Sequence, residues 1–217
     1  MIKKIRNFKF VIRNCQAGFT YVELIVVLSI FAVLSSVAIF NYGSFETKVD
    51  LKNLASDIAL QIVQAQKAAL SGLLLPSGTF TNKGAPGGKP SYGVFFNTNG
   101  TVQGANSTDF IYFADLNNDY IFNDSDCVGE CISKYIITKG DSISKLSYFN
   151  QGDSTEYPLN NNNLTITFIR PNSSATLYSG GIALPANVSY VQITVTDQKK
   201  DIFSYIKLYP PGRVEVD

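Results

Sequence analysis

The stretch QAGFTYVELIVVLSIFAVLSSVAIFNY, residues 16–42, decides the fold of this chain because a basic leader ends there and a long apolar run begins. Residues 24–45 contain no charged side chain. A helix of about 22 residues at about 1.5 Å per residue is about 33 Å long, which exceeds the roughly 30 Å hydrocarbon core of a bilayer. The run therefore predicts a membrane-spanning helix.

Glu23 does not fit an ordinary membrane anchor. An ionised carboxylate inside an apolar span costs a few kcal/mol or more unless it has a partner. If the chain were cut between Gly18 and Phe19, the new α-amino group of Phe19 would be a cation one helical turn from such a carboxylate. We therefore expect the partner of Glu23 to be an amine.

Residues 18–24, GFTYVEL, together with the basic leader before them, resemble the processing signal of type IV prepilins and type II secretion pseudopilins. In that family a membrane peptidase cuts after the glycine and methylates the new N-terminus, and the glutamate pairs with the terminal amine of a neighbouring subunit. The resemblance implies processing after Gly18, N-methylation of Phe19 and an assembly role for Glu23. The implied partners are the prepilin peptidase/methyltransferase, other pilins or pseudopilins and an inner-membrane assembly platform.

Two other interpretations of the leader stay open. A secretory signal peptide is cleaved after its apolar core, and residues 32–38 offer small side chains for such a cut. An uncleaved single-pass anchor is the other alternative. Neither of them gives Glu23 a role.

The leader carries five cations and no acid, Lys3, Lys4, Arg6, Lys9 and Arg13. This charge favours a cytoplasmic leader with the rest of the chain on the other side of the membrane. The resemblance then implies a single-pass protein of the bacterial cytoplasmic membrane, assembled in a pilus or pseudopilus. Loss of the five cations changes the formal net charge from +1 to −4, which disfavours nucleic acid as a partner.

The chain divides by pattern into a leader (1–18), a transmembrane and assembly helix (19–45) and an extracytoplasmic domain (46–217). Residues 46–72 continue the helix, with apolar residues mostly at three- and four-residue steps: Phe45, Val49, Leu51, Leu54, Ile58, Ile62, Ala65, Ala69 and Leu70. This amphipathic half needs a sheet to cover its apolar stripe. A free amphipathic helix lying on the membrane is the alternative.

Six short β-rich runs follow in residues 92–217, after a glycine- and proline-rich loop at 72–91. They are residues 92–96, 109–114, 135–138, 164–169, 190–196 and 202–208. The predicted fold class is α+β, a pilin-like long N-terminal helix packed on an antiparallel β-sheet.

The resemblance extends beyond the leader. The segment QAQKAA at 64–69, the strand YGVFF at 92–96, the acidic loop at 115–126 and the terminal GRVEV at 212–216 are similar in order to minor pseudopilins of the H type and FimT-like minor pilins. This resemblance implies a structural subunit, a minor pilin or a pseudopilin.

The acidic loop resembles a twelve-residue calcium loop in its spacing of oxygen ligands. Tyr120 stands where such loops place glycine, and the last acid is an aspartate rather than the longer glutamate. A solvated acidic turn is the alternative. The predicted ligands are the side chains of five residues and one carbonyl oxygen: Asp115, Asn117, Asp119, Asn123 and Asp126, with the carbonyl of Ile121.

Cys127 and Cys131 follow this loop, whereas Cys15 lies in the leader. A pair of cysteines outside the cytoplasm predicts a disulfide, and free thiols or a zinc ion are the rival interpretations. Zinc would lack ligands, because the chain has no histidine.

The absence of histidine also removes the commonest general base, so no Ser/His/Asp or Cys/His arrangement can form. We therefore expect no enzyme, and calcium is the one cofactor that the sequence suggests. The rival from another class is a membrane-tethered, calcium-dependent binding module with an unprocessed anchor.

Overall fold

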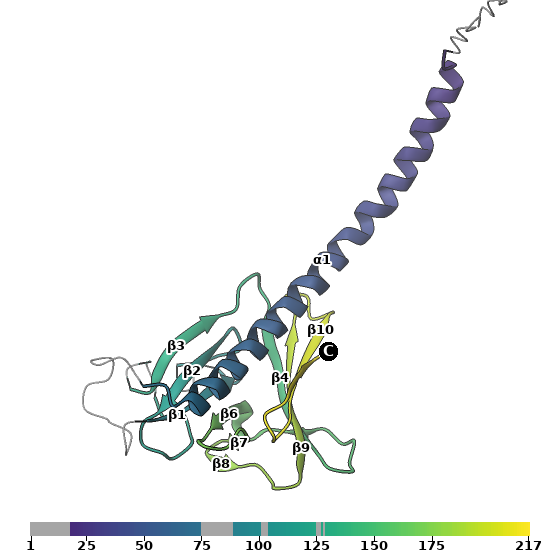
Figure 1. Ribbon diagram of the computed structural model, residues 1–217. Coiled ribbons are helices and arrows are strands. Elements are labelled where there is room, and N and C mark those ends of the chain that lie inside the picture. The colour runs from purple at the N-terminus through teal and green to yellow at the C-terminus, as the bar shows by residue number, and fades with distance from the viewer. Residues whose placement is uncertain (1–17, 75–88, 101–103, 125–126, 128) are drawn as a thin grey trace, which may run out of the picture. The chain divides into compact units, whose positions relative to one another are not determined.

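The computed structural model describes residues 18–74, 89–100, 104–124, 127 and 129–217 (Figure 1). The chain divides after Ser44 into two compact units. Helix α1, Tyr21–Ser71, begins in the first unit and ends in the second.

The second half of α1 has one buried stripe, whose members follow one another at steps of four and three residues: Leu51, Ala55, Ile58, Ile62, Ala65 and Ala69. The helix ends in a glycine cap. Gly72 has a φ of 61°, its N–H donates to the carbonyl of Ala69 at 3.1 Å, and the N–H of Leu73 donates to Ala68 at 3.1 Å. A left-handed glycine with these two bonds satisfies the last carbonyl groups of a helix.

The prediction that Phe45, Val49 and Leu70 belong to this stripe is wrong. Their side chains are 65%, 41% and 43% exposed. Each residue of an α-helix is rotated by about 100° from the one before it. Leu70 therefore points away from the face of Ala69, and Phe45 and Val49 point away from that of Leu51.

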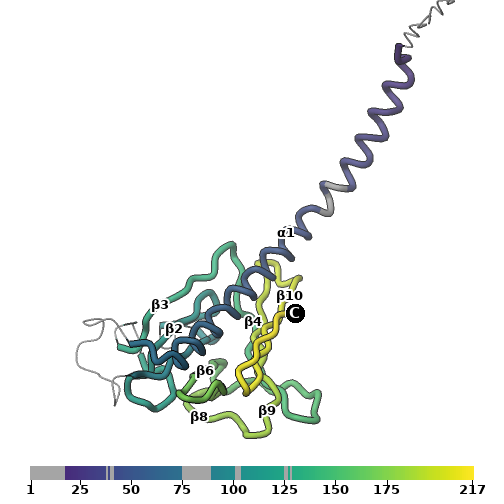
Figure 2. The backbone as a smooth tube through the Cα atoms, in the orientation of Figure 1, coloured from purple at the N-terminus to yellow at the C-terminus, as the bar shows by residue number. Residues whose placement is uncertain are grey.

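The strands form two antiparallel sheets where the sequence predicted one, so the fold is α+β with a pilin-like architecture (Figure 1). The first sheet has the order β3-β2-β1-β6-β7-β8 and the second β11-β10-β9-β4-β5. Figure 2 traces β4, β9 and β10 side by side in the second sheet. The strand bounds are Ser91–Asn97 (β1), Asp109–Asp115 (β2), Cys131–Ile136 (β3), Ser142–Asn150 (β4), Tyr157–Pro158 (β5), Asn163–Phe168 (β6), Ala175–Ser179 (β7), Ile182–Ala183 (β8), Val188–Thr196 (β9), Phe203–Leu208 (β10) and Val214–Val216 (β11).

Five of these strands were not predicted: β4, β5, β7, β8 and β11. Three of them have only two or three residues, which is too short for a periodicity. In β4 the sequence SISKLSYFN mixes serine and lysine with apolar residues, and its pairing with β9 contains two register shifts. The register shifts explain why a simple alternation does not reveal this strand.

The first sheet is covered on both faces. The buried stripe of α1 belongs to the same core as Val94 and Phe96, whereas Phe95, which points to the opposite face, packs with Phe113 and Phe122. The ring centroid of Phe122 lies 5.1 Å from that of Phe95 and 5.3 Å from that of Phe113. The loop after β2, which carries Phe122, therefore closes the outer face of this sheet.

Candidate functional site

The candidate site is the start of α1. Gly18, Phe19 and Thr20 precede the helix, and the side-chain hydroxyl oxygen of Thr20 accepts a hydrogen bond from the backbone N–H of Glu23 at 3.2 Å. The carbonyl of Thr20 accepts from the N–H of Leu24 at 3.1 Å. Thr20 is therefore the N-cap residue, and it fixes the beginning of the helix at Tyr21, three residues after Gly18. Glu23 lies in the first turn, where the helix dipole favours a carboxylate.

The side chains around this start are exposed. Phe19 is 82% exposed and Tyr21 is 77% exposed, and the exposed large apolar residues that follow in the first half of α1 have values from 48% to 73%. By length and composition α1 is able to cross a membrane. A continuous apolar surface of this kind requires lipid or another protein to cover it.

Glu23 has no cation beside it in the part of the chain that the structure describes. The ion pairs among these residues all lie at or beyond Asp50. A carboxylate in an apolar environment is costly unless a cation accompanies it. The chemistry of Glu23 suits a cation that arrives from outside the described residues.

Residues 13–39 match the family model of the prokaryotic N-terminal methylation motif. The match includes Gly18, Phe19 and Glu23. It supports a signal of the type IV prepilin kind at the start of α1. The match covers this N-terminal stretch alone, so it shows that the chain carries a methylation signal of the prepilin type. No curated protein and no solved structure matches the chain.

The acidic loop after β2 is held by hydrogen bonds to its own backbone. The Asp115 carboxylate accepts from the N–H groups of Asn118, at 2.7 Å, and Tyr120, at 3.1 Å. The side-chain amides of Asn117 and Asn123 both donate to the carboxylate of Asp119. The structure thus gathers Asn117, Asp119 and Asn123 and directs Asp115 to the backbone, while Asp126 lies outside the described residues.

Two observations bear on calcium in this loop. Tyr120 has a φ of 67°, so it adopts the left-handed conformation for which calcium loops use glycine. Among the described residues no three acidic or cysteine side chains are grouped closely enough to hold a metal, so the amides of Asn117 and Asn123 would have to contribute oxygen ligands. Calcium stays a prediction.

Sequence reasoning missed Glu130, which is 5% exposed. Its carboxylate accepts from the N–H groups of Leu116, at 3.2 Å, and Asn123, at 3.3 Å. Burial raises the pKa of both Glu130 and Asp115, and the neighbouring carboxylates, Asp119 among them, add to the shift. Glu130 thus joins the end of the loop to its beginning. It lies fourteen residues after Leu116, and a local sequence pattern does not predict a contact over that separation.

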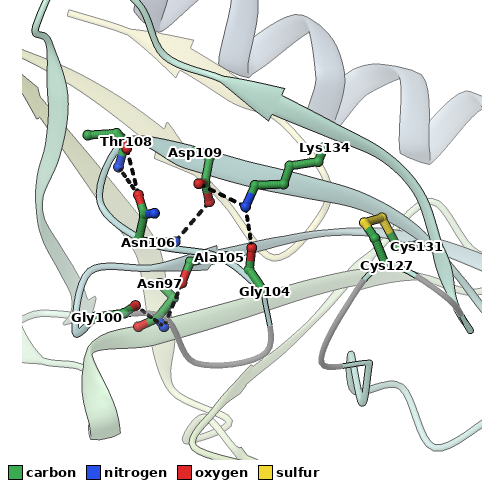
Figure 3. Close-up of polar contacts among 10 residues, drawn as sticks. All are labelled: Asn97, Gly100, Gly104, Ala105, Asn106, Thr108, Asp109, Cys127, Cys131 and Lys134. Carbon is green, nitrogen blue, oxygen red and sulfur yellow. Dashed lines mark hydrogen bonds and ion pairs between the residues drawn. A yellow bond between two sulfur atoms is a disulfide. The ribbon is translucent and has the colours of Figure 1, made fainter.

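Cys127 and Cys131 are joined by a disulfide at the end of this loop (Figure 3). The bridge lies beside the outer core, because Cys131 is buried there and Cys127 packs against it. Near it, Lys134 forms an ion pair with Asp109 at 3.1 Å and also donates to the carbonyl of Gly104 (Figure 3). Lys134 and Asp109 come from adjacent strands, so their contact ties β3 to β2.

Proposed function

We propose that this protein is a structural subunit, a minor pilin or a pseudopilin, of a type IV pilus or a type II secretion filament. The observation that carries the proposal is the start of α1, where an exposed apolar helix begins three residues after Gly18. Glu23 lies in its first turn and forms no ion pair with any residue that the structure describes. A filament would supply an apolar neighbour for the helix and a cation for Glu23.

In this proposal the peptidase cleaves the bond between Gly18 and Phe19 and methylates the new amine of Phe19. That amine, which stays positively charged, pairs with Glu23 of a neighbouring copy. Because both charges lie in an apolar environment, pairing removes a cost that each would have alone. The apolar residues of the first half of α1 then pack against other helices. Before assembly the chain is held in the cytoplasmic membrane, with residues 46–217 outside the cytoplasm.

The mass of the intact mature protein tests the proposal. Protein purified from cells that contain the prepilin peptidase should begin at N-methylated Phe19, and cells without the peptidase should yield a chain that retains Met1. Retention of Met1 in both strains would contradict the proposal and favour the membrane-tethered module.

We do not expect the second unit to bind DNA, because many of its cations lie beside acids. Four of its lysines form ion pairs with acidic side chains: Lys134, Lys139, Lys145 and Lys207. A basic patch that contacts phosphate groups needs cations that are free to do so. A band-shift assay with the full chain in detergent should therefore show no DNA binding at physiological salt.

We also propose that the acidic loop binds calcium, on the evidence of the left-handed Tyr120 and the convergence on Asp119. The Asp119→Ala variant should abolish binding, and the Asp153→Ala variant, which changes an acid in another loop, should not. Calorimetric titration of the full chain in detergent measures both. The absence of heat and of a melting shift at millimolar calcium would contradict this proposal and leave the filament role intact.

A further inference from the structure

An acidic cleft of about 180 Å³ lies between the second half of α1 and the turn that joins β3 to β4. Both walls belong to the second unit. The polar residues of the two walls are Asp50, Asn53 and Asp57 from the helix and Thr138, Lys139 and Asp141 from the turn.

The cleft has an excess of negative charge. It contains three carboxylates and one ammonium group, and the ammonium group of Lys139 is already paired with Asp50 at 2.8 Å. Asp57 and Asp141 form no ion pair with any residue that the structure describes. Two carboxylates of the cleft are therefore available to bind a cationic group.

Asp141 is the residue that distinguishes this cleft from a solvated acidic surface. Its side chain lines the cleft although the residue is only 8% exposed, and no described residue donates a hydrogen bond to its carboxylate. Burial raises its pKa, and the negative charges of Asp50 and Asp197 raise it further, against the opposing effect of Lys139. The carboxylate of Asp141 is largely removed from water and opens into the cleft, so a ligand that donates hydrogen bonds to it there would be favoured.

The spacing of the acids favours a guanidinium group. No three of the described acidic side chains are close enough to hold one metal ion. A guanidinium has five N–H donors in a planar fork and reaches carboxylates that are too far apart to share an ion. In a protein, the side chain that carries a guanidinium group is arginine.

Arg170 is the arginine that fits. Of the two arginines that the structure describes, Arg213 is paired with Glu215, whereas Arg170 is exposed and has no ion-pair partner among the described residues. Arg170 lies at the C-terminal end of α1, where its guanidinium group is next to Gly72, the residue that caps the helix. The side chain of Lys89 is also next to Gly72. The chain thus presents a basic pair at the end of the helix and an acidic cleft earlier along it.

The two features cannot meet within one copy, because Asp57 and Gly72 are separated by about 22 Å of helix at about 1.5 Å per residue. They can meet between two parallel copies that are displaced by a similar distance along the helix axis. We propose that the cleft binds the guanidinium of Arg170 from a second copy of this chain. The inference rests on the proposed function, since a filament is what would hold copies parallel and staggered.

A charge-swap experiment in cells that assemble the filament tests this contact. Asp57→Arg and Arg170→Asp should each reduce the amount of full-length protein in sheared filaments by about tenfold or more. The chain with both changes should recover most of that amount, because the swapped charges again face one another. Asp201→Arg, which changes an exposed acid outside the cleft, serves as the matched control and should have little effect.

Single variants that assemble like the wild type would overturn the inference, and so would a double variant that is not rescued. Thermal melting of each full-length variant in detergent shows whether it folds. The N-terminal mass of the wild type from the same cells separates the two proposals. With methylated Phe19 and no charge-swap effect, the filament role stands and the contact falls, whereas retained Met1 removes both.

Discussion

The two halves of helix α1 contrast in what covers their apolar side chains. In the first half, residues such as Ile30 and Leu34 are 55% and 64% exposed. In the second half, Ile58 and Ile62 are fully buried against the strands. One helix therefore carries two kinds of apolar surface, of which the second is satisfied within the chain and the first needs other molecules.

Truncation of one isoleucine in each half should give the largest difference between the two halves, measured as the free energy of unfolding. Ile58→Ala should lower the free energy of unfolding of the second unit by about 2–5 kcal/mol, because it leaves a cavity in a packed core. Ile30→Ala should change it by less than about 0.5 kcal/mol. Denaturant unfolding of the full chain in detergent, followed by tyrosine fluorescence, measures both. Equal losses for the two variants would contradict the division.

Removal of the disulfide tests how far the second unit is held by its own contacts. Replacing Cys127 and Cys131 by serine should cost at most about 2 kcal/mol, because the bridge closes a very short loop. The first half of α1 should be unaffected, so membrane insertion should persist. Without reductant, the mature wild type should not react with a thiol reagent. Labelling of free thiols in the folded, unreduced protein would count against the bridge.

Asp141 gives a smaller effect with a defined pH dependence. Burial raises its pKa in the folded state, so the folded chain binds this proton more tightly than the unfolded chain. The ionised carboxylate of Asp141 therefore lowers the stability of the fold. This destabilisation is fully present above the folded-state pKa and disappears as the pH falls towards the ordinary pKa of an aspartate. Asp141→Asn should therefore stabilise the isolated chain by about 1 kcal/mol at neutral pH and by progressively less in acid.

Thermal melting of the full chain in detergent from pH 4 to pH 8 measures this difference. The groups that act on Asp141 are Asp50, Asp197 and Lys139, and all of them stay in the variant. A destabilising effect of Asp141→Asn at neutral pH would show that the carboxylate has a donor in the folded chain.

The local pattern of the sequence predicted the elements that have a strong period or a strong composition. The helix and the strands around Val94 and Ile193 are of this kind, because their apolar runs are long enough to show a regular spacing. The start of the candidate site was also readable, since glycine, phenylalanine and glutamate stand at fixed offsets before a spanning run. Gly18, Phe19 and Glu23 all fall within the matched motif.

Contacts between segments that are far apart in the chain could not be predicted from the sequence. Glu130 reaches the N–H of Leu116 across the loop, and Asp141 meets Asp50 only because the turn after β3 folds back on the helix. The second sheet was missed for a similar reason. Its strand β4 pairs irregularly with β9, more than forty residues later in the chain, and such pairing leaves no local period.

The pairing of Glu23 with an amine of another copy is the central claim, and the filament content of a Glu23→Ala variant tests it most directly. In cells that assemble the wild type, the variant should be processed and methylated at Phe19 but should fall by about tenfold or more in the sheared filament fraction. Glu46→Ala, which removes an exposed acid from the second half of the same helix, should assemble normally. Incorporation of Glu23→Ala at the wild-type level would contradict the account.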